Sequence, residues 1–176
     1  LSQVAQNISE QAKELMRRYW PGPMTLILEK AEGVSDAVSA GLPTVAVRMP
    51  NHPVALRMME QAGLAVAAPS ANTSGRPSPT TAAHVYEDMN GRIPLILDGG
   101  ACEIGVESTI IDMTVEPPMV LRPGGLTLEK VREVIPNVAM DPGLKVDASV
   151  TPKAPGMKYR HYAPKAELYM AVGTAE

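Results

Sequence analysis

Residues 64–81 have the sequence LAVAAPSANTSGRPSPTT, from which an α/β fold is predicted. The apolar run from Leu64 to Ala68 predicts a buried strand, because it is too hydrophobic for an exposed position. Small polar residues, one glycine and three prolines follow, and they indicate a loop. Thr80 or Thr81 then caps a helix that we expect to end near Met89. A strand, a polar loop and a helix in succession are typical of an α/β sheet.

The alternation of strands and helices extends in both directions from this stretch. The expected strands are 24–28, 44–47, 94–97, 108–113 and 119–121, and the expected helices are 2–18, 53–62 and 127–135. Pro53 at a first helical position, Gly63 after a last turn and Thr127 before a helix supply start and stop signals. The pattern predicts one α/β domain over residues 1–136.

The character of the chain changes after Pro136. Residues 137–165 are rich in proline and lack a sustained hydrophobic period, so we expect a linker. A dense polar and aromatic cluster, 158–162, lies within it, and we expect this segment to act as a lid. Residues 166–176 are expected to start a second small domain. Because Leu1 stands where a methionine would open a gene product, we expect a piece of a longer protein.

The composition excludes several classes of protein. Of 176 residues, 45% are hydrophobic and 20% are charged, so a packed core is expected. The formal net charge of −3 leaves no strongly basic footprint for nucleic acid. A single cysteine, Cys102, excludes an internal disulfide, and three scattered histidines give no metal-ligand spacing. Without an apolar run of about 20 residues or a visible signal peptide, a cytoplasmic protein is expected.

Polar groups follow several of the expected strands, where ligands collect in open α/β sheets. Arg48 and Arg122 each end a strand, and a guanidinium there can hold a carboxylate or phosphate; the alternative is a surface ion pair. The hydroxyl-rich loop from Ser70 to Thr80 precedes a helix start, which favours phosphate, although it lacks known phosphate-loop motifs. The alternative is an ordinary connection. Ser108 has no nucleophile motif, so positioning rather than covalent chemistry is expected.

Six motifs occur in the order that characterises one enzyme family. They are WPGPMTL (20–26), TVAVRMP (44–50), APSANTSG (68–75), GVEST (105–109), LRPG (121–124) and APGMKYRHYAP (154–164). In these motifs the chain resembles bacterial threonylcarbamoyl-AMP synthases of the YrdC-like family, in their long two-domain form. The resemblance covers essentially the whole chain. It implies a YrdC-like twisted mixed sheet with flanking helices, followed by a linker and a second small α/β domain that is mostly absent.

The resemblance implies an ATP-dependent nucleotidyltransferase. Such enzymes join L-threonine, bicarbonate or CO2, and ATP into L-threonylcarbamoyladenylate and release pyrophosphate. The product serves N6-threonylcarbamoyladenosine formation in tRNA through downstream tRNA threonylcarbamoyl-transfer proteins. ATP is then a substrate, and Mg2+ is expected to be bound through its phosphates rather than by a protein metal site.

The resemblance also implies roles for individual residues. Arg48 matches the arginine that holds the threonine carboxylate, and Ala68 and Ser108 match residues that line the threonine pocket. The positions that match ATP-contacting residues are Thr44, Ser70, Asn72, Ser78, Arg122, Tyr159 and His161. The last two belong to the linker.

The chain departs from the family pattern at its N-terminal end. The family's Pro-Thr-Glu-Thr-x-Tyr-Gly-Leu and Lys-x-Arg…Asn-Pro segments do not occur in this sequence. The resemblance therefore implies a fragment without the N-terminal third of the domain. Two alternatives stay open: an RNA-binding YrdC-like module and a carbamoyl-transfer domain of a hydrogenase-maturation protein. The net charge of −3 counts against the first, and the linker that ends His161-Tyr162-Ala163-Pro164 counts against the second.

Overall fold

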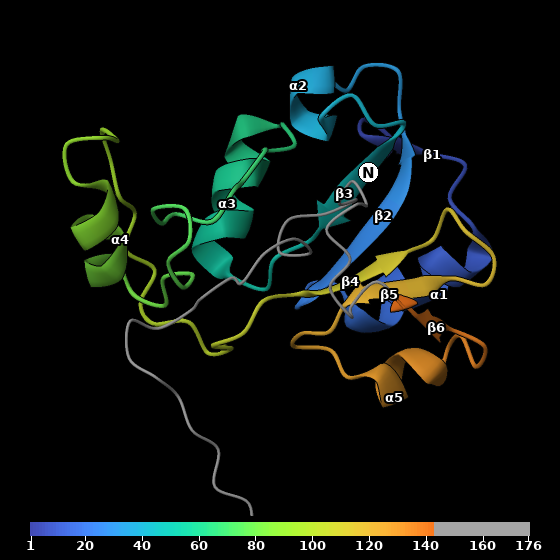
Figure 1. Ribbon diagram of the computed structural model, residues 1–176. Coiled ribbons are helices and arrows are strands. Elements are labelled where there is room, and N and C mark those ends of the chain that lie inside the picture. The colour runs from blue at the N-terminus through green and yellow to red at the C-terminus, as the bar shows by residue number, and fades with distance from the viewer. Residues whose placement is uncertain (143–176) are drawn as a thin grey trace, which may run out of the picture.

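The computed structural model describes residues 1–142 and shows a six-stranded mixed sheet with helices around it (Figure 1). The strand order is β1-β2-β4-β5-β6, and β3 pairs with β2. The pairs β2–β4 and β5–β6 are parallel, whereas the other pairs are antiparallel. The elements are β1 Ala5–Gln6, α1 Glu10–Tyr19, β2 Met24–Lys30, α2 Asp36–Ser39, β3 Thr44–Arg48, α3 Pro53–Ala62, α4 Ala82–Met89, β4 Thr109–Asp112, β5 Met119–Arg122, α5 Leu128–Arg132 and β6 Ala139–Met140. The expected α/β fold with a mixed sheet is confirmed.

The main core lies on one face of β2, the central strand. Alternate residues of a strand share a face, and Met24, Leu26 and Leu28 occupy this one. They join Leu15 of α1 and Val131 of α5 in one buried cluster. Burial of each such side chain contributes about 1.5–3 kcal/mol to stability. A smaller cluster on the opposite face contains Ile27, Ile110 and Leu121. The two clusters hold β2, β4 and β5 in register, and this register positions the strand ends.

The helix signals in the sequence are largely confirmed. Thr81 and Thr127 cap α4 and α5 by accepting backbone N–H groups, and Gly63 ends α3 in the left-handed conformation with φ 63°. The helix expected over 2–18 begins only at Glu10, because Ser9 caps it, and Ala5–Gln6 form β1 instead. The helix expected over 127–135 ends at Arg132.

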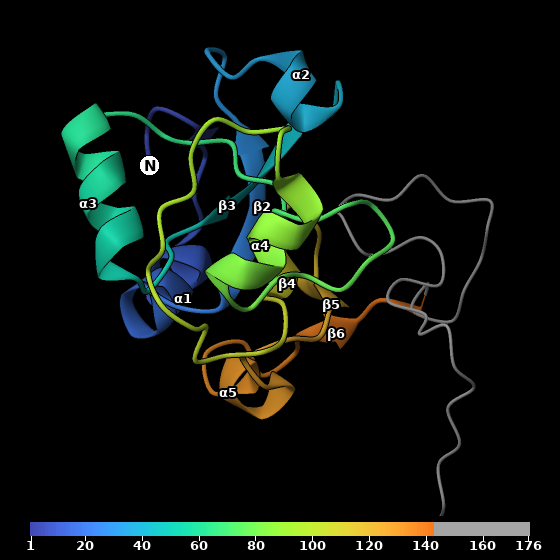
Figure 2. The same cartoon turned by 90° about the vertical axis from the view of Figure 1, so that its left-hand side faces the viewer.

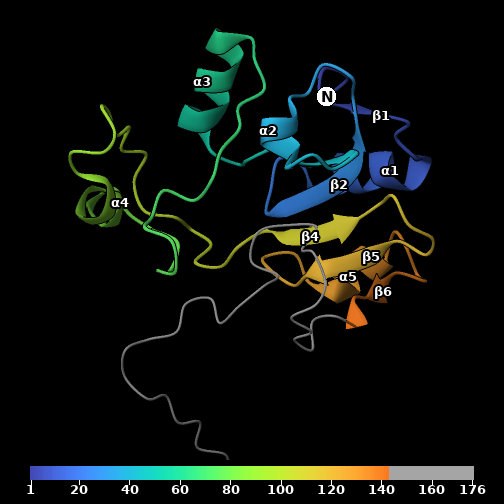
Figure 3. The same ribbon diagram turned by 45° about the horizontal axis from the view of Figure 1, so that its top comes forward.

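Two expected strands, 64–68 and 94–97, are wrong. Both segments are irregular, and their side chains are exposed: Leu64 retains 67% of its accessible surface and Leu95 69%. A strand needs a neighbouring ladder to satisfy its backbone, and no described segment pairs with either one. Figures 1 and 3 show α3 and α4 standing apart from the sheet, and Figure 2 views that side directly. Neither helix has a fully buried residue.

The end of the described chain differs from the expected linker. Ala139–Met140 forms β6, which pairs in parallel with Met119 and Val120 of β5. The segment after Pro136 therefore contributes to the sheet before the described residues end. The domain boundaries at 136 and 165 stay a prediction. Among residues 1–142, no helix has the length and apolar character needed to cross a membrane.

Candidate functional site

The sheet register brings three of the predicted site residues to one edge. Arg48 of β3 lies opposite Thr25 of β2, Thr25 lies opposite Ile110 of β4, and Ile110 lies opposite Arg122 of β5. Neighbouring strands are about 4.8 Å apart, so this row spans about 14 Å. Ser108 immediately precedes β4 at the same edge. We call Thr25, Arg48, Ser108 and Arg122 the strand-end cluster.

Ser108 is the centre of the strand-end cluster. Its hydroxyl lies 2.7 Å from Thr25 Oγ1, and both residues are buried. Arg122 donates from Nη2 to Ser108 Oγ at 3.2 Å and to the Ser108 carbonyl oxygen at 2.9 Å. Its Nε donates to the same carbonyl at 3.2 Å. The guanidinium of Arg122 therefore fixes both the backbone and the hydroxyl of Ser108. The predicted role of Ser108 in the threonine pocket stays a prediction.

Arg48 presents a cation at the other end of the row. Its Nε donates to the carbonyl oxygen of Gly22 at 3.0 Å, which orients the guanidinium. Partial burial lowers the pKa of Arg48, although a guanidinium stays charged in proteins. In the described part of the chain, neither terminal nitrogen of Arg48 has a hydrogen-bond or ion-pair partner. A partly desolvated cation whose terminal N–H groups are available suits a carboxylate. The alternative of a surface ion pair is not what residues 1–142 show.

Gly124 allows the strand-end cluster to close. A Cβ at this position would lie 2.3 Å from the Glu107 carbonyl oxygen and 2.5 Å from the Ser108 carbonyl carbon. The chain after β5 therefore packs directly on the backbone before β4, and Gly125 N donates to the Glu107 carbonyl at 2.9 Å. The LRPG motif supplies both the arginine and the glycine of this contact.

Ser78 is the predicted nucleotide residue that reaches this region. Its hydroxyl donates to Glu107 Oε1 at 3.3 Å, beside Ser108. Through this contact the end of the Ser70–Thr80 loop lies next to the strand-end cluster. Sequence reasoning did not single out Glu107 or Thr25, because neither residue carries a signal of its own before the pairing is known.

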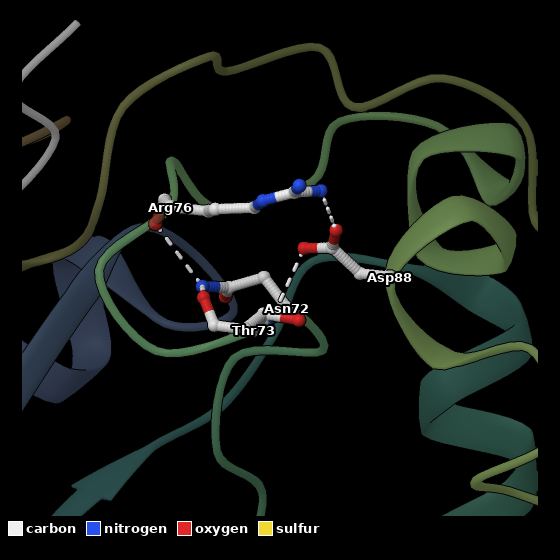
Figure 4. A network of polar contacts seen from close by, with 4 residues as sticks. All are labelled: Asn72, Thr73, Arg76 and Asp88. Atoms are coloured by element: carbon white, nitrogen blue, oxygen red, sulfur yellow. Dashed lines mark hydrogen bonds and ion pairs between the residues drawn. The ribbon is translucent and has the colours of Figure 1, made fainter. Parts of the chain in front are cut away.

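Asn72 stabilises the loop from within (Figure 4). Its side-chain amide donates to the carbonyl oxygens of Thr73 at 2.9 Å and of Arg76 at 3.1 Å. Its Oδ1 is buried and has no partner among the described residues. Buried polar atoms in folded proteins nearly always have a partner, so a donor from a ligand or water would satisfy this oxygen.

Other predicted site residues lie elsewhere. Thr44 begins β3, four residues from Arg48 and thus about 13 Å along the strand. Ala68 and Ser70 are exposed on the connection between α3 and α4. Tyr159 and His161 lie outside the described residues. The expectation that Arg48, Ser70 and Arg122 face one cavity stays a prediction.

A shallow hollow of about 150 Å³ lies beside the start of α4. The residues that line it are Pro79, Thr80, Thr81, Ala82, Val85, Ile96, Leu97, Asp98, Gly99, Gly100 and Cys102. Pro79 and Thr80 belong to the hydroxyl-rich loop whose sequence favours phosphate, whereas none of the lining residues was assigned to threonine or ATP by the resemblance. Within residues 1–142, histidine, cysteine, aspartate and glutamate side chains form no group of three that could hold a metal ion.

Two family models match consecutive parts of the chain. Residues 1–124 match the model for Sua5, YciO and YrdC proteins, which is described as "Telomere recombination". Residues 126–176 match a model described as "Threonylcarbamoyl-AMP synthase, C-terminal domain".

Curated relatives carry the synthase name. The threonylcarbamoyl-AMP synthase of Pyrococcus abyssi is 53% identical over 173 residues, which are 98% of this chain and 51% of the relative. That of Bacillus subtilis is 52% identical over 168 residues, 95% of this chain and 48% of the relative. The chain thus spans about half the length of these relatives.

Solved structures agree with this relationship. The chain superposes on a crystal structure of P. abyssi Sua5 complexed with L-threonine with a TM-score of 0.89 and 54% identity, covering 94% of this chain and 48% of that one. Escherichia coli YciO shares the fold with a TM-score of 0.64 and 24% identity, over 71% of this chain and 61% of that chain. The family-model match over residues 1–124 shows that the chain belongs to the Sua5, YciO and YrdC family.

Proposed function

We propose that the protein containing this chain synthesises L-threonylcarbamoyladenylate from L-threonine, bicarbonate or CO2, and ATP, with release of pyrophosphate. The strand-end cluster is the observation that carries the proposal, because it places two guanidinium groups and a fixed hydroxyl at one sheet edge. Relatives that are 53% and 52% identical to this chain over nearly its whole length are named for this activity. Their names favour it over an RNA-binding module or a carbamoyl-transfer domain.

The threonine side of the proposed site is built on Arg48. Its available N–H groups would bind the threonine carboxylate, and the Ser108 hydroxyl, with Ala68, would line the pocket. A charge-assisted, bidentate contact fixes the carboxylate in one orientation. The threonine amine then points away from the guanidinium. Support for threonine as the ligand comes from the related P. abyssi structure, which is complexed with L-threonine.

The chemistry follows from the three substrates. The threonine nitrogen attacks CO2, forms a C–N bond and loses a proton to give a carbamate. A carbamate oxygen then attacks the α-phosphorus of ATP, and the bond to the β-phosphate breaks so that pyrophosphate leaves. Both steps depend on holding the reactants together in the right orientation, which can supply a large part of the rate acceleration.

The nucleotide side is proposed to use Arg122, the Ser70–Thr80 loop and Thr44, with Tyr159 and His161 contributing from beyond the described residues. Arg122 sits beside Ser108, and Ser78 approaches through Glu107. Mg2+ is proposed to bind through the phosphates of ATP. The product would pass to proteins that transfer the threonylcarbamoyl group to tRNA.

Product formation by the intact protein tests the proposal. ATP, L-threonine and isotope-labelled bicarbonate are supplied, and the adenylate is identified by mass spectrometry while pyrophosphate is quantified. We expect a labelled adenylate that requires all three substrates. An absence of labelled adenylate, or pyrophosphate release that does not require threonine, would overturn the proposal.

A further inference from the structure

Asp88 of α4 is a carboxylate whose two oxygens are both bound by the Ser70–Thr80 loop (Figure 4). Oδ2 accepts a hydrogen bond from the backbone N–H of Thr73 at 2.9 Å, and Oδ1 forms an ion pair with the guanidinium of Arg76. Only 7% of the Asp88 side chain is exposed, whereas that of Arg76 is 61% exposed. A carboxylate at this depth is stable only with such partners.

The position of Asp88 gives its own helix no benefit. It lies in the last turn of α4, Ala82–Met89, where the negative end of the helix dipole disfavours an acid. The carboxylate therefore acts on the loop and not on the helix. Its pKa is held below the ordinary range, chiefly by the Thr73 N–H, against the effect of burial and with further help from Arg76.

The loop residues that Asp88 holds are themselves linked. Asn72 donates to the carbonyls of Thr73 and Arg76, and the Arg76 N–H donates to the Thr73 carbonyl at 3.1 Å. Gly75 turns the chain between them with φ 89°. Asp88 thus secures both ends of a closed turn. The secured Thr73 N–H belongs to the residue next to Asn72 and lies three residues from Ser70.

We propose that Asp88 is a positioning residue for nucleotide binding, which holds the loop in the shape that presents Ser70 and Asn72 to ATP. The inference rests on the proposed function of this loop. Arg76 acts through the same turn, as the ion-pair partner of Asp88. Neither residue contacts Arg48, the proposed threonine-binding residue, so we expect their main effect on the nucleotide side.

ATP binding and steady-state kinetics of the intact protein test this role. We expect Asp88→Ala to raise the Kd and KM for ATP by about ten- to a hundredfold, the range for losing a charge-assisted hydrogen bond. The KM for threonine is expected to change less than about twofold, because no hydrogen bond or ion pair joins Arg48 to the turn among the described residues. Asp88→Asn keeps an oxygen for Thr73 N–H, so its effect is expected to be smaller.

Further variants keep the test decisive if Asp88→Ala does not fold. Arg76→Gln removes the same ion pair. The KM for ATP of the double variant with Asp88→Asn is expected to be no higher than that of the more impaired single variant. Glu60→Gln is the matched control, because the Arg57–Glu60 ion pair of 2.7 Å on α3 does not touch the loop. If the effects of the two substitutions add in the double variant, Arg76 and Asp88 act independently of each other, and the shared role is overturned.

The outcomes separate this inference from the proposed function. If the unaltered protein binds no ATP, both are overturned. If it binds ATP and the Asp88 variants bind it as tightly, only the role of Asp88 is overturned. The same holds if those variants lower kcat and the melting temperature without changing the KM for ATP.

Discussion

Thr25 Oγ1 and Ser108 Oγ lie 2.7 Å apart, and their hydrogen bond joins the central strand β2 to the residue that immediately precedes β4. Arg122 donates to the same Ser108 hydroxyl from β5. The hydroxyl is therefore held from two strands before any substrate binds. Such preorganisation avoids the cost of ordering a side chain during the reaction.

Thr25→Val tests whether this hydrogen bond is needed. Valine keeps the shape of threonine but leaves the buried Ser108 hydroxyl without one partner, so we expect a loss of about 1–2 kcal/mol of unfolding free energy. Urea denaturation of the intact protein measures it. Thr44→Val is the control, since no side-chain hydrogen bond of Thr44 occurs among the described residues. Equal stability of both variants would show that the contact contributes nothing.

Arg122→Ala should impair the use of both substrates. The guanidinium is proposed to contact ATP, but it also holds the backbone and hydroxyl of Ser108 in the threonine pocket. We therefore expect the KM for ATP to rise by about tenfold or more and the KM for threonine to rise as well. Arg122→Lys keeps the positive charge but lacks the several N–H donors of a guanidinium, so both KM values are expected to stay close to those of Arg122→Ala. A change in neither KM would remove Arg122 from the site.

Gly124→Ala should displace the backbone of residues 107–109. The added Cβ meets main-chain atoms, which cannot move aside as a flexible side chain could. We expect a loss of about 1–3 kcal/mol in stability, as for overpacking elsewhere, together with reduced activity. Gly33→Ala is the matched control, because nothing lies within 4 Å of its Cβ. Thermal unfolding that is unchanged in Gly124→Ala would contradict the close packing.

The lowered pKa of Asp88 predicts how the stability of the folded protein depends on pH. Its folded pKa lies below the unfolded value of about 3.9, mainly through Thr73 N–H and then Arg76, with Arg92 also lowering it. The stabilisation is then fully present above the unfolded pKa and is lost as pH falls through the folded pKa. The difference in melting temperature between wild type and Asp88→Asn should be constant from pH 5 to 8 and shrink below about pH 4. A difference that changes between pH 5 and 8 would contradict this assignment.

Local signals in the sequence predicted most elements of the sheet domain. Thr81, Thr127 and Gly63 act within one turn of the chain, so their capping roles do not depend on distant residues. The strands at Thr44–Arg48 and Met119–Arg122 follow from short apolar runs that find pairing partners in the sheet, with Val45, Val120 and Leu121 buried. Segments 64–68 and 94–97 have equally apolar runs, but a strand also requires a partner, and composition does not reveal one.

The candidate site was predictable only where its residues sit at strand ends. Arg48 and Arg122 were expected at the same end of the sheet because strand ends converge there. The strand register places both residues in one row at that end. Thr25 and Asp88 could not be found this way. Thr25 forms its hydrogen bond with Ser108, which lies 83 positions later in the sequence. Asp88 accepts a hydrogen bond from Thr73, which lies 15 positions earlier. Such contacts depend on the pairing of strands and the packing of a loop, which no local pattern reveals.

The threonine dependence of pyrophosphate release tests the central claim most directly. With ATP and bicarbonate fixed, release is measured against L-threonine concentration for the intact wild type and for Arg48→Ala. The account predicts that wild-type release requires threonine and that the variant needs about ten- to a hundredfold more of it, with the KM for ATP unchanged. Equal threonine requirements in the two proteins would contradict the assignment of Arg48 to the carboxylate.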